Sequence, residues 1–252
     1  MRWPGRILRV AAAALALGLA APGAARACAL ELILALDVSG SIDAREFGIQ
    51  TEGLAAAFED PRLIAAIDAL PGGIVVTMTH WSGISRQRQM TPWARIEEPA
   101  DAHAFAASIR GAGRAWRNFS TAIGEAIMHA RDVSETAPVD CTRRVLDISG
   151  DGVSNEGRHP SSASDVLAGD GFIINGLVIR GAEPDPVQQY LEQVIAGPGA
   201  FVEVADGFAD YPRAILKKLL REIDKPLLVS EQATPSNDLA RAAPDTPELQ
   251  ER

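Results

Sequence analysis

Residues 30–41, LELILALDVSGS, decide the fold and supply the first candidate site residues. The first seven are mostly apolar, which is typical of a strand buried on both faces of a parallel sheet. Asp37, Ser39 and Ser41 then place three oxygen-bearing side chains at alternate positions, with Gly40 turning the chain. Hard divalent cations such as Mg²⁺ prefer oxygen ligands, whereas zinc and copper prefer His or Cys. The same pattern also fits helix capping by Ser41.

Strand-like and helix-like stretches alternate from this segment to residue 223. The patterns predict strands at residues 30–36, 74–81, 86–96, 143–149, 171–179 and 201–204. They predict helices at residues 42–58, 62–70, 101–110, 120–134, 161–167, 186–195 and 208–223. This alternation indicates an α/β fold, in which helices cover both faces of a mostly parallel, doubly wound sheet. Such a sheet places its ligand site at the carboxyl ends of its strands.

Two later segments bring further oxygen ligands to that edge. Residues 121–127, TAIGEAI, place Thr121 at the start of a predicted helix, and Asp151 follows the predicted strand 143–149. Because loops after parallel strands meet at one edge, we expect these residues to converge with Asp37. The sequence has no dinucleotide fingerprint after the first strand, no phosphate loop, no nucleophile elbow and no zinc motif.

Together these segments resemble the von Willebrand factor A domain family. The motifs are Asp-x-Ser-x-Ser after the first strand, Thr-x-x-Gly-x-Ala-Ile at a helix start and Ser-Gly-Asp-Gly after a later strand, and the resemblance covers residues 30–223. It implies a Rossmann-like, six-stranded sheet of order 3-2-1-4-5-6, with strand 3 antiparallel at the edge. It also implies a metal-ion-dependent adhesion site, whose ligand residues by position are Asp37, Ser39, Ser41, Thr121 and Asp151.

The resemblance further implies binding without turnover. In this family a divalent cation keeps one coordination position open for a carboxylate of a protein partner. We expect Mg²⁺, with Mn²⁺ or Ca²⁺ as alternatives. Because the chain has Phe119-Ser120 where the family often has Gly-Gly, either Ser120 or Thr121 faces the metal. We favour Thr121, whose spacing to Gly124 and Ala126 fits the motif.

Two short segments narrow the resemblance to an exported bacterial branch of the family. They are Trp81-Ser82-Gly83 after the second strand and Ser154-Asn155 after Asp151.

Two alternatives to a binding domain stay open. A Mg²⁺-dependent, phosphatase-like hydrolase would use Asp37 as its nucleophile. Such enzymes generally place a second carboxylate two residues later, where this chain has Ser39. A metal-free structural domain would use Asp37 and the serines only as helix caps. We expect a binding protein and not an enzyme.

The sequence has two cysteines, Cys28 and Cys141. Each lies two residues before a predicted strand, and the two strands are neighbours in the implied order. Since Cys28 precedes Asp37 by 9 residues and Cys141 precedes Asp151 by 10, both sulfurs should lie together at the opposite end of the sheet. Export exposes a protein to oxidising conditions. We therefore predict a Cys28–Cys141 disulfide.

The two ends of the chain differ from its middle. Residues 1–27 combine a basic start, an apolar stretch and small residues before Cys28, which predicts a secretory signal peptide. The apolar stretch is shorter than the ~20 residues that span a bilayer, so no membrane span is expected after cleavage. Residues 28–225 are the predicted domain, and residues 226–252 are a predicted disordered tail. The protein is expected in the periplasm or outside the cell.

The charge of the chain limits its partners. It has 33 acidic against 24 basic residues, a net charge of −9, and residues 1–27 hold four arginines and no acid. The remaining chain is therefore more acidic still. We expect no nucleic-acid partner, because an acidic chain gains nothing from the charge of phosphates. The expected partners are a cation and a protein that presents a carboxylate.

Overall fold

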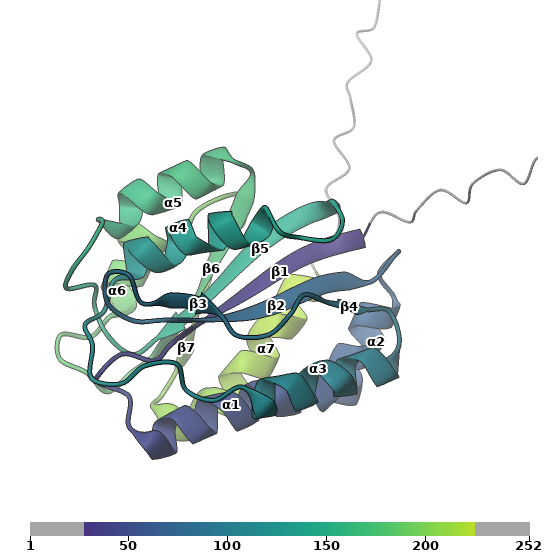
Figure 1. Cartoon of the computed structure of the whole chain (residues 1–252), viewed down its shortest axis with the longest axis horizontal. Coiled ribbons are helices and arrows are strands. Elements are labelled where there is room, and N and C mark those ends of the chain that lie inside the picture. Colours follow the sequence, from purple (N-terminus) through teal and green to yellow (C-terminus); the bar gives the residue numbers. More distant parts are fainter. Residues whose placement is uncertain (1–27, 225–252) are drawn as a thin grey trace, which may run out of the picture.

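A twisted sheet forms the centre of the molecule, and helices cover both of its faces (Figure 1). The computed structural model describes residues 28–224, so the predictions for residues 1–27 and 226–252 lie outside the described residues. Within the described part, no helix is long and apolar enough to cross a membrane.

The sheet has seven strands in the order β3-β2-β1-β5-β6-β7, with β4 also paired to β2. The strands β2, β1, β5, β6 and β7 run parallel, whereas β3 and β4 run antiparallel to β2. The predicted mostly parallel sheet with an antiparallel edge is confirmed. The strands are β1 (Cys28–Asp37), β2 (Ile74–Trp81), β3 (Gln87–Gln89), β4 (Ala94–Ile96), β5 (Cys141–Gly150), β6 (Phe172–Ile179) and β7 (Val202–Ala205).

The edge strand predicted over residues 86–96 is wrong in one respect, because it divides into β3 and β4. The backbone N–H groups of Met90 and Thr91 both donate to the carbonyl of Met78, at 2.7 and 3.3 Å. Met90 and Thr91 therefore lie opposite the single residue Met78. This arrangement is a β-bulge, and it interrupts the regular pairing of the two strands. Pro92 follows and has no N–H to continue the ladder.

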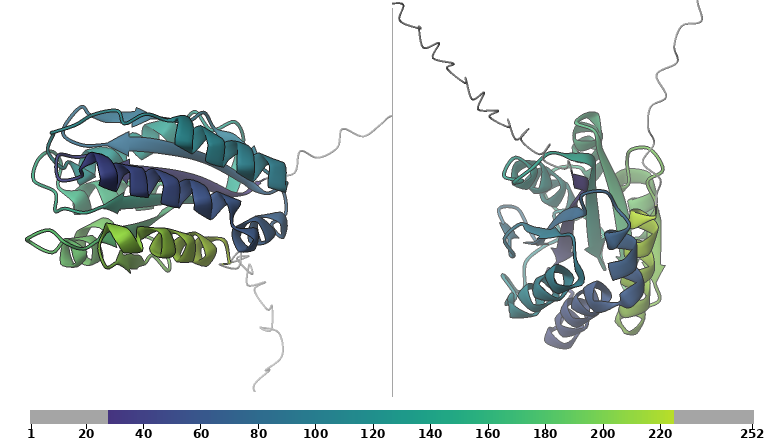
Figure 2. Two further views of the ribbon diagram at one scale, coloured as in Figure 1. Left: turned by 90° about the horizontal axis from the view of Figure 1, so that it is seen from below. Right: turned by 90° about the vertical axis from the view of Figure 1, so that its right-hand side faces the viewer.

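The helices form two layers that Figure 2 shows from the side. One layer buries Leu54, Leu63, Phe105 and Leu219 against the sheet, and the other buries Ile127 and Leu167. The first layer comprises α1 (Ala44–Glu59), α2 (Pro61–Asp68), α3 (Pro99–Gly111) and α7 (Tyr211–Ile223). The second comprises α4 (Ile123–Ser134), α5 (Pro160–Gly169), α6 (Val187–Gln189) and the π-helical turn Tyr190–Val194.

Three helices depart from the predicted helices by more than a shift of one or two residues at each end. The helix predicted at 120–134 begins only at Ile123, the one at 186–195 becomes the short α6 with the π-helical turn, and the one at 208–223 begins with the 3₁₀ turn Phe208–Asp210. In the π-helical turn, the N–H of Ile195 donates to the carbonyl of Tyr190, five residues back.

A disulfide joins Cys28 and Cys141, as the sequence predicts. The two residues are register partners at the beginning of the parallel strands β1 and β5, with their Cα atoms 4.6 Å apart. The strands begin at the cysteines themselves and not two residues later. The disulfide therefore lies at the end of the sheet where these strands begin.

A buried charge cluster fixes α7 to the sheet. The Lys218 ammonium, 0% exposed, lies 2.5 Å from Asp147 of β5 and 2.7 Å from Glu222. Asn175 of β6 donates to the Glu222 carboxylate at 3.0 Å. Burial raises the pKa of Asp147 and Lys218 opposes that rise. The single ammonium of Lys218 is therefore shared by two buried carboxylates.

Candidate metal site

The loop after β1 forms a turn that is closed by the carboxylate of Asp37. Asp37 is the last residue of β1 and is fully buried. Its Oδ1 atom accepts the backbone N–H of Ser39 at 2.7 Å, a bond that closes the turn. The Ser39 side chain, also buried, then lies 3.2 Å, Oγ to Oγ, from Ser41. The two hydroxyls are consequently adjacent.

Ser41 reaches across to the loop after β5. Its Oγ atom donates to Oδ1 of Asp151 at 2.7 Å. Helix capping does not occupy Ser41, because Asp43 caps α1: its carboxylate accepts the N–H of Glu46 at 2.8 Å, and the Glu46 carboxylate accepts the N–H of Asp43 at 2.8 Å. The capping role considered for Ser41 is therefore wrong, and its hydroxyl faces Asp151.

The structure places Thr121 at this cluster and Ser120 beside it. Thr121 lies in the loop before α4 and is only 6% exposed. A Cβ atom built on Gly152, next to Asp151, would be 3.8 Å from Oγ1 of Thr121. The Ser120 carbonyl instead accepts the hydroxyl of Ser82 at 3.0 Å. Thr121 is therefore the hydroxyl residue of this loop that lies next to Asp151.

Backbone bonds hold the Thr121 loop to the loop after β5. Asn155 accepts the N–H of Thr121 on its side-chain oxygen at 3.0 Å and donates its own N–H to the Thr121 carbonyl at 2.9 Å. The Ser154 hydroxyl accepts the N–H of Ile123 at 3.2 Å. These bonds satisfy N–H groups at the start of α4, and they explain why that helix begins later than predicted.

The segment after β2 also supports the Thr121 loop. The Ser82 carbonyl accepts the N–H of Ala122 at 3.0 Å. Trp81 is fully buried, and its ring N–H donates to the carbonyl of Ala35 at 3.1 Å. Trp81 is therefore a core residue under the site.

The two carboxylates of the site repel one another. Burial and, to a smaller extent, the charge of the neighbouring Asp151 raise the pKa of Asp37 to about 8. Burial also raises the pKa of Asp151, while its bond to Ser41 lowers it. The Oδ2 atom of Asp37 is buried and has no hydrogen-bond partner among the described residues. A buried oxygen without a partner is energetically costly unless another group satisfies it.

A hard divalent cation fits this arrangement. It would satisfy Oδ2 of Asp37 and reduce the repulsion between the carboxylates. Two carboxylates with three hydroxyls form an oxygen donor set, which suits Mg²⁺, Mn²⁺ or Ca²⁺. The residues that would hold such an ion are Asp37, Ser39, Ser41, Thr121 and Asp151. Among the described residues, no group of three or more His, Cys, Asp or Glu side chains is placed to hold a metal.

Three further residues shape the site, and of these only Gly150 belongs to a motif that the sequence marks. Arg114 donates to the carbonyls of Val38 and Ser39 at 3.0 and 2.9 Å and so holds the first loop. A Cβ atom at Gly150 would lie 2.7 Å from the Tyr190 hydroxyl and 3.0 Å from Oδ2 of Asp37. Gly150 therefore leaves room for the carboxylate. The Tyr190 hydroxyl is buried, and burial raises its pKa.

A groove of about 480 Å³ borders the site. Ser41 and Asp151 line it together with Glu46 and two arginines, Arg45 and Arg180. Arg180 pairs with Asp185 at 3.3 Å and is half exposed. The groove thus places Arg45 and Arg180 near Asp151, although Glu46 and Asp206 add negative charge to its lining.

The fold is similar to that of von Willebrand factor A domains. Proximal thread matrix protein 1 from the mussel byssus is similar, with a TM-score of 0.58 and 17% identity, covering 77% of this chain and 48% of that one. A von Willebrand factor type A protein from Catenulispora acidiphila has a TM-score of 0.53 and 18% identity, covering 79% and 44%. The vWF domain of the pilus tip protein Mfa5 from Porphyromonas gingivalis has a TM-score of 0.54 and 9% identity, covering 79% and 98%.

This chain belongs to the family described as protein of unknown function DUF1194, whose model matches residues 27–227. A comparison with curated proteins finds no match. The chain spans about half the length of the mussel protein and less than half of the Catenulispora protein. At these identities, the likeness to solved structures shows the fold alone.

Proposed function

We propose that this chain is an exported binding domain that holds a divalent cation and captures a protein partner through an acidic group. The observation that carries the proposal is the contact of Ser41 with Asp151, next to the unpartnered buried oxygen of Asp37. It gathers oxygen ligands from separate loops around one centre. We propose Mg²⁺ as the ion, with Mn²⁺ or Ca²⁺ as alternatives. The mussel protein has been solved with a zinc-occupied MIDAS motif, which supports a divalent ion in this fold.

The groove beside the site supports an acidic partner. Arg45 and Arg180 line it, and Arg180 pairs with Asp185 and Asp206. A bound cation adds positive charge at Asp151, so a carboxylate that entered the open coordination position would be attracted by the cation and by Arg45.

A binding role fits the site better than hydrolysis. Asp37 is 0% exposed, and Ser39 stands where a second carboxylate would act as acid and base. We therefore propose that the domain is not an enzyme. Hydrolysis of p-nitrophenyl phosphate by the wild type, lost in Asp37→Asn, would favour the hydrolase instead.

Water relaxation with Mn²⁺ tests the open coordination position. Mn²⁺ bound to the wild-type protein should enhance the relaxation of water protons, and added acetate should reduce that enhancement by replacing bound water. Acetamide, which is neutral, is the matched control and should have little effect. Equal effects of acetate and acetamide would contradict carboxylate capture. Equal enhancement in Asp37→Asn would show that Mn²⁺ binds elsewhere.

A further inference from the structure

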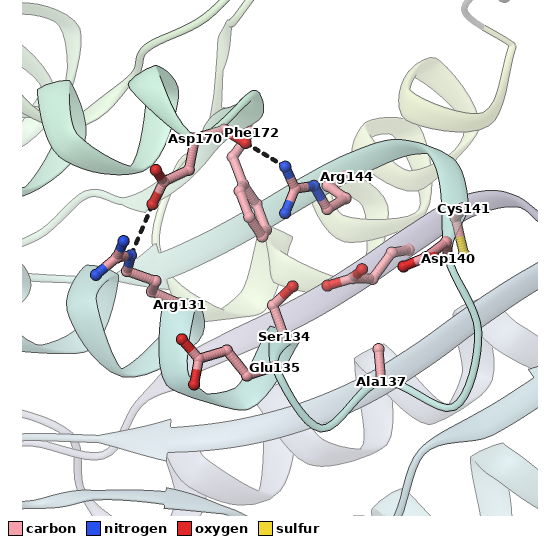
Figure 3. Close-up of a pocket in the computed structure, with 10 residues that line it drawn as sticks. Arg131, Ser134, Glu135, Ala137, Asp140, Cys141, Arg144, Asp170 and Phe172 are labelled. Carbon is pink, nitrogen blue, oxygen red and sulfur yellow. Dashed lines mark hydrogen bonds and ion pairs between the residues drawn. The ribbon is translucent and has the colours of Figure 1, made fainter.

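A second cavity lies near the disulfide, toward the ends of the strands opposite the candidate metal site. It measures about 630 Å³ and lies among β1, β5, the beginning of β6 and the carboxyl end of α4 (Figure 3). Its volume falls in the range of small-molecule sites. Its lining residues are Glu31, Arg131, Ser134, Glu135, Ala137, Asp140, Cys141, Arg144, Asp170 and Phe172.

Glu31 is the unusual residue of this cavity. It lies in β1 and is 3% exposed, while Ile33 and Ala35 on the same side of the strand belong to the apolar core. Its Oε1 atom is buried and has no hydrogen-bond partner among the described residues. Burial raises the pKa of Glu31, and a hydrogen bond from Ser134 lowers it. Burial of a carboxylate oxygen without a hydrogen-bond partner lowers the stability of the fold unless a ligand supplies that partner.

The arginines of the lining are already engaged with Asp170. Arg131 pairs with the Asp170 carboxylate at 2.6 Å. Arg144 donates to the Asp170 carbonyl and lies over the ring of Phe172, 4.6 Å from its centroid. Figure 3 shows both arginines directed toward Asp170. Arg144 also lowers the pKa of Glu31, so the charge of Glu31 is only partly compensated.

The rest of the lining favours a positive group. Glu135 and Asp140 are exposed, and neither forms an ion pair among the described residues. The helix α4 ends at Ser134, and the carboxyl end of a helix carries partial negative charge. Glu31 is the buried carboxylate of the lining, whereas Glu135 and Asp140 are exposed. A single ammonium group needs only one buried counter-ion, and Glu31 supplies it.

We propose that this cavity is a second ligand site that binds an alkylammonium group, with Glu31 as its buried counter-ion and Asp140 at its rim. The group belongs either to a free amine or to a lysine side chain of a partner. The ammonium supplies hydrogen-bond donors and charge to the Glu31 carboxylate. The site is independent of the candidate metal site and does not rest on the proposed function.

Calorimetric titration of the whole protein with 1,4-diaminobutane in EDTA tests the proposal. EDTA keeps the metal site out of the measurement. We expect saturable binding at one site, and about tenfold or more weaker binding in Glu31→Gln, because a charged hydrogen bond is lost. Asp68→Asn, which removes one exposed charge on the other helix layer, is the control and should bind as the wild type does. The neutral 1,4-butanediol should not bind.

A second variant and further measurements test the proposal even if Glu31→Gln fails to fold. Asp140→Asn changes an exposed residue and should weaken binding about twofold or more. Hydrogen exchange of residues 134–141 should slow when diamine is added. A capped Gly-Lys-Gly peptide that binds more tightly than the diamine would assign the ammonium to a partner's lysine, and the reverse result to a free amine. No binding of either, equal binding of the diol, or unchanged binding in both variants would overturn the proposal.

Discussion

Ser41 donates a hydrogen bond of 2.7 Å to Asp151, which lies 110 residues further along the chain. The bond connects the loop after β1 to the loop after β5, and the unpartnered oxygen of Asp37 lies against Gly150 in the same cluster. The parallel pairing of β1 with β5 brings these loops together. The candidate metal site is thus a direct consequence of the strand order.

Replacement of Thr121 by Val should lower the affinity for Mn²⁺ about tenfold or more, the scale on which a lost partner weakens a metal site. The valine keeps the shape of the side chain but removes the hydroxyl next to Asp151. Ser120→Ala is the matched control and should leave the affinity unchanged, because the Ser120 carbonyl makes the contact to Ser82. Titration calorimetry measures both. A larger loss in Ser120→Ala would show that Ser120 is the ligand.

Removal of the disulfide should destabilise the protein by about 3–5 kcal/mol, because the bond closes a long loop in the unfolded chain. Cys28 and Cys141 are 113 residues apart in sequence. Urea unfolding of the Cys28→Ser/Cys141→Ser variant measures the loss. A reducing agent should produce a similar loss in the wild type and none in the variant. Equal stability of the two oxidised proteins would contradict this prediction.

The neighbouring lysines of α7 should respond differently to replacement by Met. Lys218→Met should cost about 3–5 kcal/mol, because it leaves the buried Asp147 and Glu222 without their counter-ion. Lys217→Met removes only a partly exposed pair with Glu203 and should cost about 1 kcal/mol or less. Chemical denaturation compares the two. Similar losses would mean that the cluster does not depend on the Lys218 charge.

His80 should contribute a loss of stability as the pH falls from about 6.5 to about 4. His80 is fully buried, and neither ring nitrogen has a hydrogen-bond partner among the described residues. Burial and, to a smaller extent, the charges of Arg114 and Arg88 lower its pKa to about 4. In this pH range the unfolded chain therefore binds a proton that the folded protein does not, which favours unfolding. The effect amounts to about 3 kcal/mol at most.

His80→Leu tests this origin of the pH dependence. The variant removes the proton-binding group from a site where Phe47 already packs against the ring, at 5.6 Å between centroids. Between pH 7 and pH 4 the variant should gain stability relative to the wild type, because the opposing effect of carboxyls with raised pKa, such as Asp37, is present in both proteins. An unchanged slope would assign the acid sensitivity to other groups.

Much of the fold follows from patterns that are local in the sequence. The predicted strand 74–81 matches β2 without change, because its apolar run is buried on both faces and ends at a glycine-containing turn on either side. The pairing of Cys28 with Cys141 is likewise predictable from their similar distances, 9 and 10 residues, to Asp37 and Asp151.

The deviations arise where contacts distant in sequence determine local structure. α4 begins late because Asn155 and Ser154 bind the N–H groups ahead of it. The roles of Arg114 and Tyr190 at the site depend on the tertiary fold, and no spacing in the sequence marks them. In the sequence, Glu31 only interrupts an apolar strand, and its place in the lining of a cavity becomes apparent from the structure.

Thermal unfolding with and without divalent cation tests the central claim most directly. Wild-type protein in EDTA should unfold at a lower temperature than with Mg²⁺ or Mn²⁺, because an ion that binds only the folded state stabilises it by about 2.7 kcal/mol at a hundredfold excess over Kd. For a domain of this size, that corresponds to a rise of roughly 5–10 °C. Asp37→Asn should fold without the ion and show no such rise. Equal cation-induced rises in wild type and Asp37→Asn, or none in either, would contradict the assignment of the metal site.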